Sequence, residues 1–192
     1  MKDLKDRFWT APNQLTLLRL IFVPFVVMNV LDRDYGWALG LFVAAGLSDA
    51  LDGLLARVLE QRTRVGQFLD PIADKLLLSS MFLVLSFTRQ IPWRYTVLVF
   101  SRDVCILAIA AVLYMTTSIH DFRPSFLGKL NTVAEVGAVF FVLLANVVDA
   151  HSVLLLRKSF LYATFFLTTF SGIHYVLLTG QRLHGINQGQ SG

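Results

Sequence analysis

The sequence predicts an all-α integral membrane protein, with six transmembrane helices in one bundle and a short interfacial helix at the N-terminus. Of its 192 residues, 55% are hydrophobic and only 16% are charged, whereas about a quarter of a soluble domain is charged. The apolar residues gather in six long runs, and we expect a single domain spanning residues 1–192. This composition excludes a disordered chain. The net charge of +4, spread over scattered basic residues, argues against nucleic-acid binding.

Six segments are long and apolar enough to cross a bilayer, which takes about 20 such residues in a helix. They are approximately Leu15–Leu31, Trp37–Leu59, Lys75–Phe87, Trp93–Met115, Leu127–Val148 and Val153–Gly180. The third is short as an apolar run, and we expect its helix to begin further back, at Pro71. Pro24 should kink the first helix, which neighbouring helices can tolerate in a membrane.

The two ends of the chain differ from these apolar segments. Residues 1–11 place Phe8 and Trp9 beside basic side chains and lack the cleavage site of a secretory signal. This pattern predicts a helix lying on the membrane surface, with a frayed tail as the alternative. Residues 185–192 are polar, and we expect them to be disordered.

Basic residues in the short connections predict the orientation of the bundle, because they gather on the cytoplasmic side of a membrane. The side that holds both termini carries more lysines and arginines than the opposite side. We therefore expect both termini, and the connection between the second and third helices, to lie in the cytoplasm. The bacterial inner membrane is the expected location of this multi-pass protein.

Four aspartates surround the connection between the second and third helices, and carboxylates within a membrane usually mark function. Asp49 and Asp52 are three residues apart, and Asp70 and Asp74 are four apart. Each pair therefore shares one face of its helix. The stretch of residues 53–69 would let the two helices return side by side, so that the two pairs face each other.

Carboxylates crowded into one cleft repel each other unless they are protonated or bind cations. Hard divalent ions such as Mg²⁺ and Mn²⁺ prefer oxygen ligands, and a pair of such ions is suited to displacement at phosphorus. No histidine lies near the four aspartates in the sequence, which argues against a zinc or di-iron site. The pattern therefore favours a hard divalent cation if a metal is bound.

The residues between the two aspartate pairs suit a phosphorylated substrate. Gly53 and Ala56 have almost no side chain, so a ligand can lie against the helix backbone. Arg57 can bind phosphate oxygens through two parallel hydrogen bonds, and Thr63 adds a hydroxyl group.

Helix capping is the alternative explanation for Asp70, because Pro71 would then stand at the first helical position. Gly66 would relax the turn just before it. Capping does not explain four aspartates and an arginine at these spacings.

This aspartate-rich segment resembles the signature of the class I CDP-alcohol phosphatidyltransferases at every fixed position. The matching residues are Asp49-x-x-Asp52-Gly53-x-x-Ala56-Arg57, followed by Gly66, Asp70 and Asp74. The segment Pro12-Asn13-x-x-Thr16-x-x-Arg19 is similar to the N-terminal part of the same family. The resemblance covers nearly the whole chain.

The resemblance implies an enzyme that transfers the phosphatidyl group of CDP-diacylglycerol to an acceptor hydroxyl and releases CMP. Two divalent cations, Mg²⁺ or Mn²⁺, would be bound by Asp49, Asp52, Asp70 and Asp74, and Asp74 would also be the general base. The CDP-lipid site would be lined by Asn13, Thr16, Gly53, Ala56, Arg57 and Thr63. The family also implies a cytoplasmic active site and a homodimer.

A second polar set on the later helices bears on the acceptor. Arg102, Arg123 and Lys129 could form an anion pocket, which suits glycerol 3-phosphate and a phosphatidylglycerophosphate product. Alternatively, Arg102 only pairs with Asp103, and Lys129 only extends to the lipid headgroups. The stretch of residues 124–132 is similar to both phosphatidylglycerophosphate synthases and CMP-forming cardiolipin synthases. Residues 102–104 are closer to the latter, so phosphatidylglycerol is the alternative acceptor.

The sequence also allows predictions for Glu135 and Cys105, and it leaves two alternative functions to consider. Glu135 lies within the fifth apolar segment and must find a partner or face a cavity, and Cys105 should pack among apolar residues. A cation transporter and a membrane prenyltransferase are distant alternatives. The single acidic cluster and the Gly-x-x-Ala-Arg segment after Asp52 fit both poorly.

Overall fold

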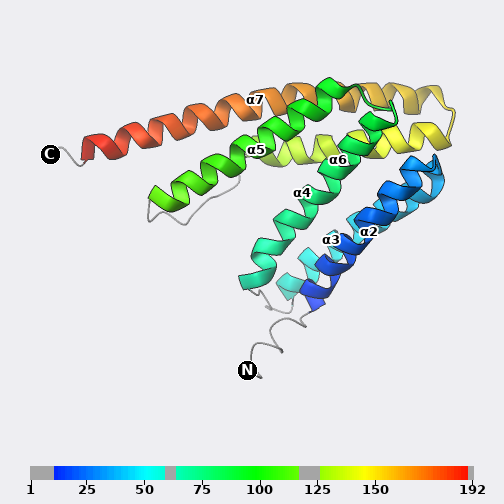
Figure 1. Cartoon of the computed structure of the whole chain (residues 1–192), viewed down its shortest axis with the longest axis horizontal. Helices are drawn as coiled ribbons and strands as arrows, with labels where there is room; N and C mark the ends of the chain where they lie inside the picture. The colour runs from blue at the N-terminus through cyan, green and yellow to red at the C-terminus, as the bar shows by residue number, and fades with distance from the viewer. Residues whose placement is uncertain (1–10, 59–63, 117–125, 190–192) are drawn as a thin grey trace.

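The computed structural model describes residues 11–58, 64–116 and 126–189, and it describes the side chains of residues 18–48, 73, 75–106 and 127–172. Within these ranges the chain forms six α-helices and no strand, which confirms the all-α prediction (Figure 1). The helices are α2 (Ala11–Leu31), α3 (Tyr35–Val58), α4 (Arg64–Phe87), α5 (Trp93–Thr116), α6 (Phe126–Val147) and α7 (His151–Gly189).

The fourth helix begins earlier than the hydropathy pattern predicts. It starts at Arg64, so Gly66, Asp70 and Pro71 all lie inside the helix. The alternative in which Asp70 caps this helix is therefore wrong, and Gly66 does not form a turn. Polar residues interrupt the apolar run here without ending the helix, and an internal proline is tolerated where neighbouring helices satisfy the freed backbone groups.

The two ends of the chain also bear on the predictions. Helix α7 continues to Gly189, so residues 185–189 are helical where we expected disorder. The interfacial helix predicted for residues 1–11 lies almost entirely outside the described residues, because α2 already begins at Ala11. Pro24 lies inside α2, whose helical hydrogen bonding continues on both sides of it.

The helices form two groups that diverge from one end of the molecule. Helix α2 packs along both α3 and α4, and α7 packs along both α5 and α6. Figure 1 shows the first group descending and the second running sideways, with the connections at residues 32–34 and 148–150 at the end where they meet. Helices α3 and α4 are not among the pairs that pack extensively. They are held together mainly by α2, which packs along both of them.

Apolar side chains fill the region near the short connections. The fully buried residues there include Val30 on α2, Leu85 on α4 and Leu143 on α6. Gly137 on α6 lies so close to α7 that a Cβ atom would come within 2.2 Å of Phe160 Cε1. Close approach at small residues is how helices associate in lipid, where there is no hydrophobic force between them.

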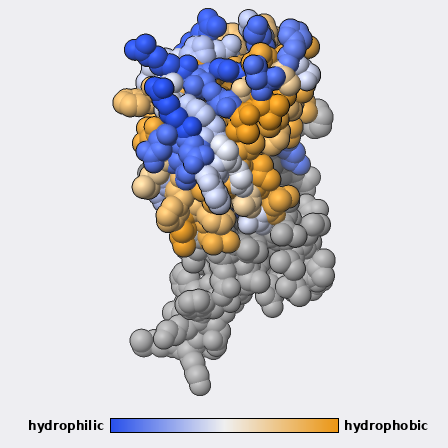
Figure 2. Space-filling view, turned by 90° about the vertical axis from the view of Figure 1, so that its right-hand side faces the viewer, coloured by the Kyte–Doolittle hydropathy of each residue, from blue (hydrophilic) through white to orange (hydrophobic). Residues whose placement is uncertain are grey.

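The surface and the helix lengths fit a membrane protein. Leu127–Val147 in α6 and His151–Gly172 in α7 are long and apolar enough to cross a bilayer, and α2, α3 and α4 hold shorter apolar segments. Trp37 and Trp93 are 69% and 51% exposed near the starts of α3 and α5, as an aromatic belt at a membrane interface predicts. Figure 2 faces the end with the short connections, where hydrophilic residues gather above exposed hydrophobic ones.

Candidate functional site

The four aspartates lie on two consecutive helices, at the ends that face each other across one short connection. Asp49 and Asp52 are in the second half of α3, and Asp70 and Asp74 are in the first half of α4. Residues 59–63 join the helices, so an extended connection separates Val58 from Arg64 by at most about 20 Å. The side chains of all four aspartates are outside the described residues, so whether the two pairs face each other stays a prediction.

The residues predicted to bind the CDP-lipid gather at the same end. Asn13 and Thr16 are in the first turns of α2, and the segment 53–57 is in the last turns of α3. These helices are joined by residues 32–34 and pack along each other, so the start of α2 lies beside the end of α3. Thr63 falls outside the described residues. Arg19 follows on α2 and is buried, with 1% of its surface exposed.

The donor set fits hard divalent cations by its chemistry. All four candidate ligands are carboxylates, and no histidine or cysteine stands beside them in α3 or α4. Among the side chains that the structure describes, no group of three or more histidine, cysteine, aspartate or glutamate residues could hold a metal ion. The four aspartates are not part of that set.

A chain of polar contacts, partly buried at Lys75 and buried further along, begins one residue after Asp74 and passes through α4, α5, α6 and α7. We call it the polar ring, because both of its ends reach α7, at two residues that are one helical turn apart. Its members are Lys75, Arg102, Asp103, Asn131, Glu135, Thr168 and Ser171.

The charged part of the polar ring is centred on Asp103. Its Oδ1 atom accepts hydrogen bonds from Lys75 Nζ at 2.9 Å and from Arg102 Nη1 at 2.7 Å. Lys75 Nζ also lies 3.7 Å from Glu135 Oε2. Two cations and two carboxylates thus balance each other, and Lys75 is the most exposed of the four side chains, at 32%.

The neutral part of the polar ring returns through α7. Asn131 Nδ2 donates to Glu135 Oε1 at 2.6 Å, and Thr168 Oγ1 donates to Asn131 Oδ1 at 2.8 Å. Arg102 Nη2 donates to Ser171 Oγ at 3.4 Å, the longest of these hydrogen bonds. Thr168 and Ser171 are three residues apart on one face of α7, so the contacts close on themselves.

These contacts decide several predictions. Arg102 is buried and pairs with Asp103, as the salt-bridge alternative predicts, and Glu135 finds its partners on α4 and α6. Lys129 is exposed at the start of α6, and Arg123 lies outside the described residues. The ring members that we did not predict include Lys75, Thr168 and Ser171. A lysine beside an aspartate inside an apolar segment was the signal available for the first.

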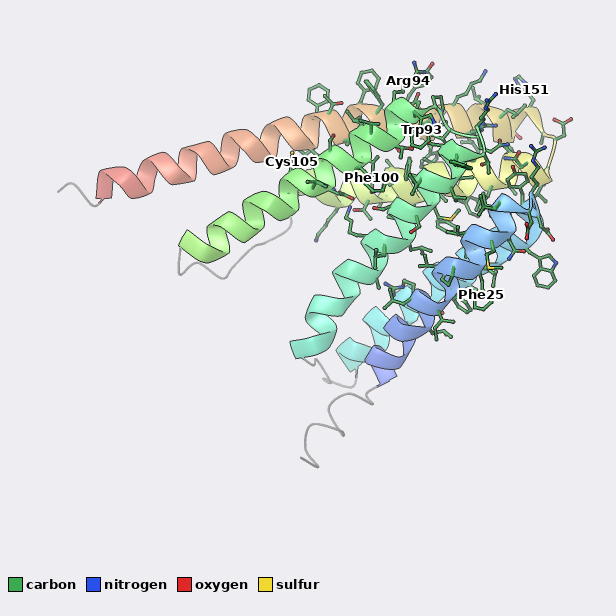
Figure 3. All side chains as sticks on the ribbon, in the orientation of Figure 1. Phe25, Trp93, Arg94, Phe100, Cys105 and His151 are labelled. Atoms are coloured by element: carbon green, nitrogen blue, oxygen red, sulfur yellow. The ribbon has the colours of Figure 1, made fainter. Side chains whose placement is uncertain are left out.

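Four labelled residues among the described side chains lie outside the polar ring (Figure 3). Cys105 is exposed on α5, so it does not pack in the core as expected (Figure 3). Figure 3 also shows Trp93 and Arg94 at the start of α5, and His151 at the start of α7. These three residues lie near the short connections, at the end opposite the aspartates.

Comparison with known proteins identifies the family. A model of the CDP-alcohol phosphatidyltransferase family matches residues 9–170, and the chain belongs to this family. The aspartate positions of α3 and α4 fall inside the matched region.

The relatives carry two kinds of name. A human CMP-forming cardiolipin synthase is 34% identical over 151 residues, which cover 69% of this chain and 50% of the relative. A probable phosphatidylglycerophosphate synthase of Mycobacterium tuberculosis H37Rv is 33% identical over 195 residues, covering 96% of this chain and 88% of the relative. A putative cardiolipin synthase of the same strain is 32% identical over 129 residues, covering 67% and 61%. The chain spans about half the length of the human relative.

Proposed function

We propose that this protein is a phospholipid-synthesising phosphatidyltransferase. It transfers the phosphatidyl group of CDP-diacylglycerol to an acceptor hydroxyl and releases CMP. The observation that carries this proposal is the placement of two aspartate pairs on consecutive helices joined by residues 59–63, within the region that matches the family. The packing of α2 on α3 and α4 supports a CDP-lipid site at the same end.

Each step of the proposed reaction is assigned to side chains of this chain. Asn13, Thr16, Gly53, Ala56, Arg57 and Thr63 hold the CDP group of the lipid. Asp74 removes the proton of the acceptor hydroxyl, and the resulting oxygen attacks the phosphorus that bears diacylglycerol. The bond from that phosphorus to the CMP oxygen breaks. Two divalent cations, Mg²⁺ or Mn²⁺, bound by Asp49, Asp52, Asp70 and Asp74, would stabilise the charge on the diphosphate.

Glycerol 3-phosphate is the acceptor that we propose first, and its product is phosphatidylglycerophosphate. The probable phosphatidylglycerophosphate synthase of Mycobacterium tuberculosis aligns with 96% of this chain. Arg102, Arg123 and Lys129 are the proposed contacts of the acceptor phosphate, and Arg102 is also hydrogen-bonded to Asp103. Phosphatidylglycerol is the alternative acceptor, favoured by the 34% identity to a CMP-forming cardiolipin synthase.

The proposed setting is a bilayer crossed by all six helices, with both termini and the aspartates in the cytoplasm of a bacterium. Helices α2 to α6 have 21 to 24 residues, close to the number of about 20 that spans the hydrocarbon. A homodimer is part of the proposal through the family alone.

The test is CMP release by the purified protein from CDP-diacylglycerol with Mg²⁺ or Mn²⁺ and a candidate acceptor. We expect release that stops when the metal is chelated and returns when it is restored. Asp74→Asn should abolish release, whereas Asp149→Asn, at an exposed aspartate of the opposite end, should leave it unchanged. An Asp74→Asn protein with the wild-type rate would overturn the assignment of the base.

The acceptor is decided by the same assay with the acceptor varied. Glycerol 3-phosphate and phosphatidylglycerol are supplied separately, and the lipid product is separated and identified. If CMP is released with phosphatidylglycerol but not with glycerol 3-phosphate, phosphatidylglycerol is the acceptor.

A further inference from the structure

We propose that Lys75 is a positioning residue, whose ion pairs with α5 and α6 fix the rotation of α4 where that helix carries Asp74. This proposal rests on the proposed function, because it concerns the aspartate assigned as the base. Lys75 need not touch a substrate to act in this way.

The contacts of Lys75 hold its ammonium group from two directions. Asp103 on α5 lies 2.9 Å from Nζ, and Glu135 on α6 lies 3.7 Å from it. The carboxylate of Glu135 is fully buried, and that of Asp103 is only 12% exposed, so neither is free to move into water. Glu135 is itself held by Asn131, which is held in turn by Thr168. Lys75 thus connects α4 directly to α5 and α6, and through Glu135 and Asn131 it is linked to α7.

The packing of α4 explains why this connection matters. Its main partner is α2, and it touches α5 and α6 only lightly. The other polar tie between α4 and α5 is near their short connection, where Thr96 contacts Ser86 and donates to Phe82 O at 3.0 Å. Residues 75 and 86 are about 16 Å apart along the helix axis. The first half of α4 therefore has Lys75 as its polar tie to the second group of helices among the described residues.

Helix geometry transmits this constraint to the neighbouring residue. Consecutive residues of an α-helix are about 100° apart around the axis and 1.5 Å apart along it. Holding residue 75 toward α5 and α6 therefore sets the direction in which residue 74 leaves the helix. A rotation that displaces a reacting group by about 1 Å can lower a rate by about a hundredfold.

The experiment compares Lys75→Met and Lys75→Arg with the wild type by steady-state kinetics of CMP release. Lys75→Met should lower kcat by about a hundredfold and change KM for CDP-diacylglycerol less than about threefold, because the base is displaced while the lipid site is intact. Lys75→Arg keeps a cation between the two carboxylates and should recover kcat to within about tenfold of the wild type. Thr96→Val is the matched control, since it removes the other tie between α4 and α5 and should leave kcat unchanged.

Binding of Mn²⁺ without substrates gives a readout that does not depend on turnover. Since Asp74 is also a proposed metal ligand, Lys75→Met should weaken Mn²⁺ binding, measured by electron paramagnetic resonance, by about tenfold, and Thr96→Val should not. A wild type that binds Mn²⁺ but releases no CMP with any acceptor would end the proposed function. Weaker Mn²⁺ binding by Lys75→Met would in that case still support positioning.

Two results would overturn the proposal. One is a folded Lys75→Met protein with wild-type kcat and wild-type Mn²⁺ binding. If the Lys75→Met protein does not fold, the double variant Lys75→Met with Glu135→Gln is tested in its place, because it removes one charge of each sign. Its behaviour gives the second result. If this double variant also fails to fold, or folds with wild-type kcat, the ion pairs serve the stability of the bundle and do not position the base.

Discussion

The apolar core and the polar ring lie at different heights along the same helices and specify different things. The core near the short connections holds residues such as Val30, Leu85 and Leu143, whose contacts have no preferred direction. The polar ring contacts depend on distance and angle, so they specify how far each helix is rotated. The core decides which helices pack together, and the polar ring decides their register beside the aspartates.

Activity and stability should therefore separate along the helix axis. A change close to residue 74 should lower activity more than stability, and a change near the short connections should do the opposite. The substitutions below test this separation, in order from the largest expected effect to the smallest.

Asp52→Asn should give the largest effect. The amide keeps the size of the side chain but removes a charge from the proposed metal site, so CMP release should fall by about a thousandfold. The melting temperature of the metal-free protein should stay the same or rise, because one carboxylate fewer repels its neighbours. Activity within tenfold of the wild type would place Asp52 outside the site.

Gly137→Ala should disturb the core without reaching the site. The added Cβ would lie 2.2 Å from Phe160 Cε1, so either the Phe160 ring moves or α6 and α7 separate, at a cost of about 1–3 kcal/mol. Thermal denaturation measures this loss, and kcat at a permissive temperature should be unchanged. Gly40→Ala is the matched control, because nothing lies within 4 Å of its added Cβ. Equal melting temperatures for the two variants would show that the Phe160 ring moves aside without cost.

Glu135→Gln should give an effect that is smaller than that of Lys75→Met. The amide oxygen can still accept from Asn131, and Lys75 keeps its 2.9 Å contact with Asp103. The variant leaves one excess positive charge in the ring, and we expect kcat to fall by no more than about tenfold. Kinetics of CMP release measure it, and a loss as large as that of Lys75→Met would make Glu135 the principal partner of Lys75.

Thr96→Val should give the smallest effect. The variant removes the hydroxyl that contacts Ser86 and donates to Phe82 O, far from the aspartates. Hydrogen bonds between helices in a membrane contribute about 0.6 kcal/mol on average, so the melting temperature should fall only slightly. A fall in kcat would show that both polar ties of α4 and α5 influence the site.

Hydropathy predicted the approximate ranges of the six helices because each of them contains a long apolar segment. It placed the start of α4 too late, at Pro71 instead of Arg64, because Asp70, Asp74 and Lys75 interrupt the apolar run inside a continuous helix. It also missed residues 185–189 of α7, because a polar segment carries no hydropathy signal even when it is helical.

The polar ring shows what spacing along a chain can and cannot predict. The pairing of Arg102 with Asp103 was open to prediction because the residues are adjacent. The contact between Lys75 and Glu135 joins helices that are 60 residues apart in sequence, and no periodicity specifies which faces of two distant helices meet. The need of Glu135 for a partner was predictable from its burial in an apolar segment, but the identity of that partner was not.

The contacts of the polar ring can form only in a set order during synthesis, because its members emerge from the ribosome one helix at a time. Lys75 leaves the ribosome before Asp103, and Glu135 follows later, so the ion pairs of Lys75 form only after α5 and α6 have emerged. The hydroxyl groups of Thr168 and Ser171 arrive last, with α7. A nascent chain that stops before α7 leaves the side chains of Asn131 and Arg102 without these two partners. The final helix therefore completes the bundle, and a truncated chain would expose uncompensated polar groups that mark it as unfinished.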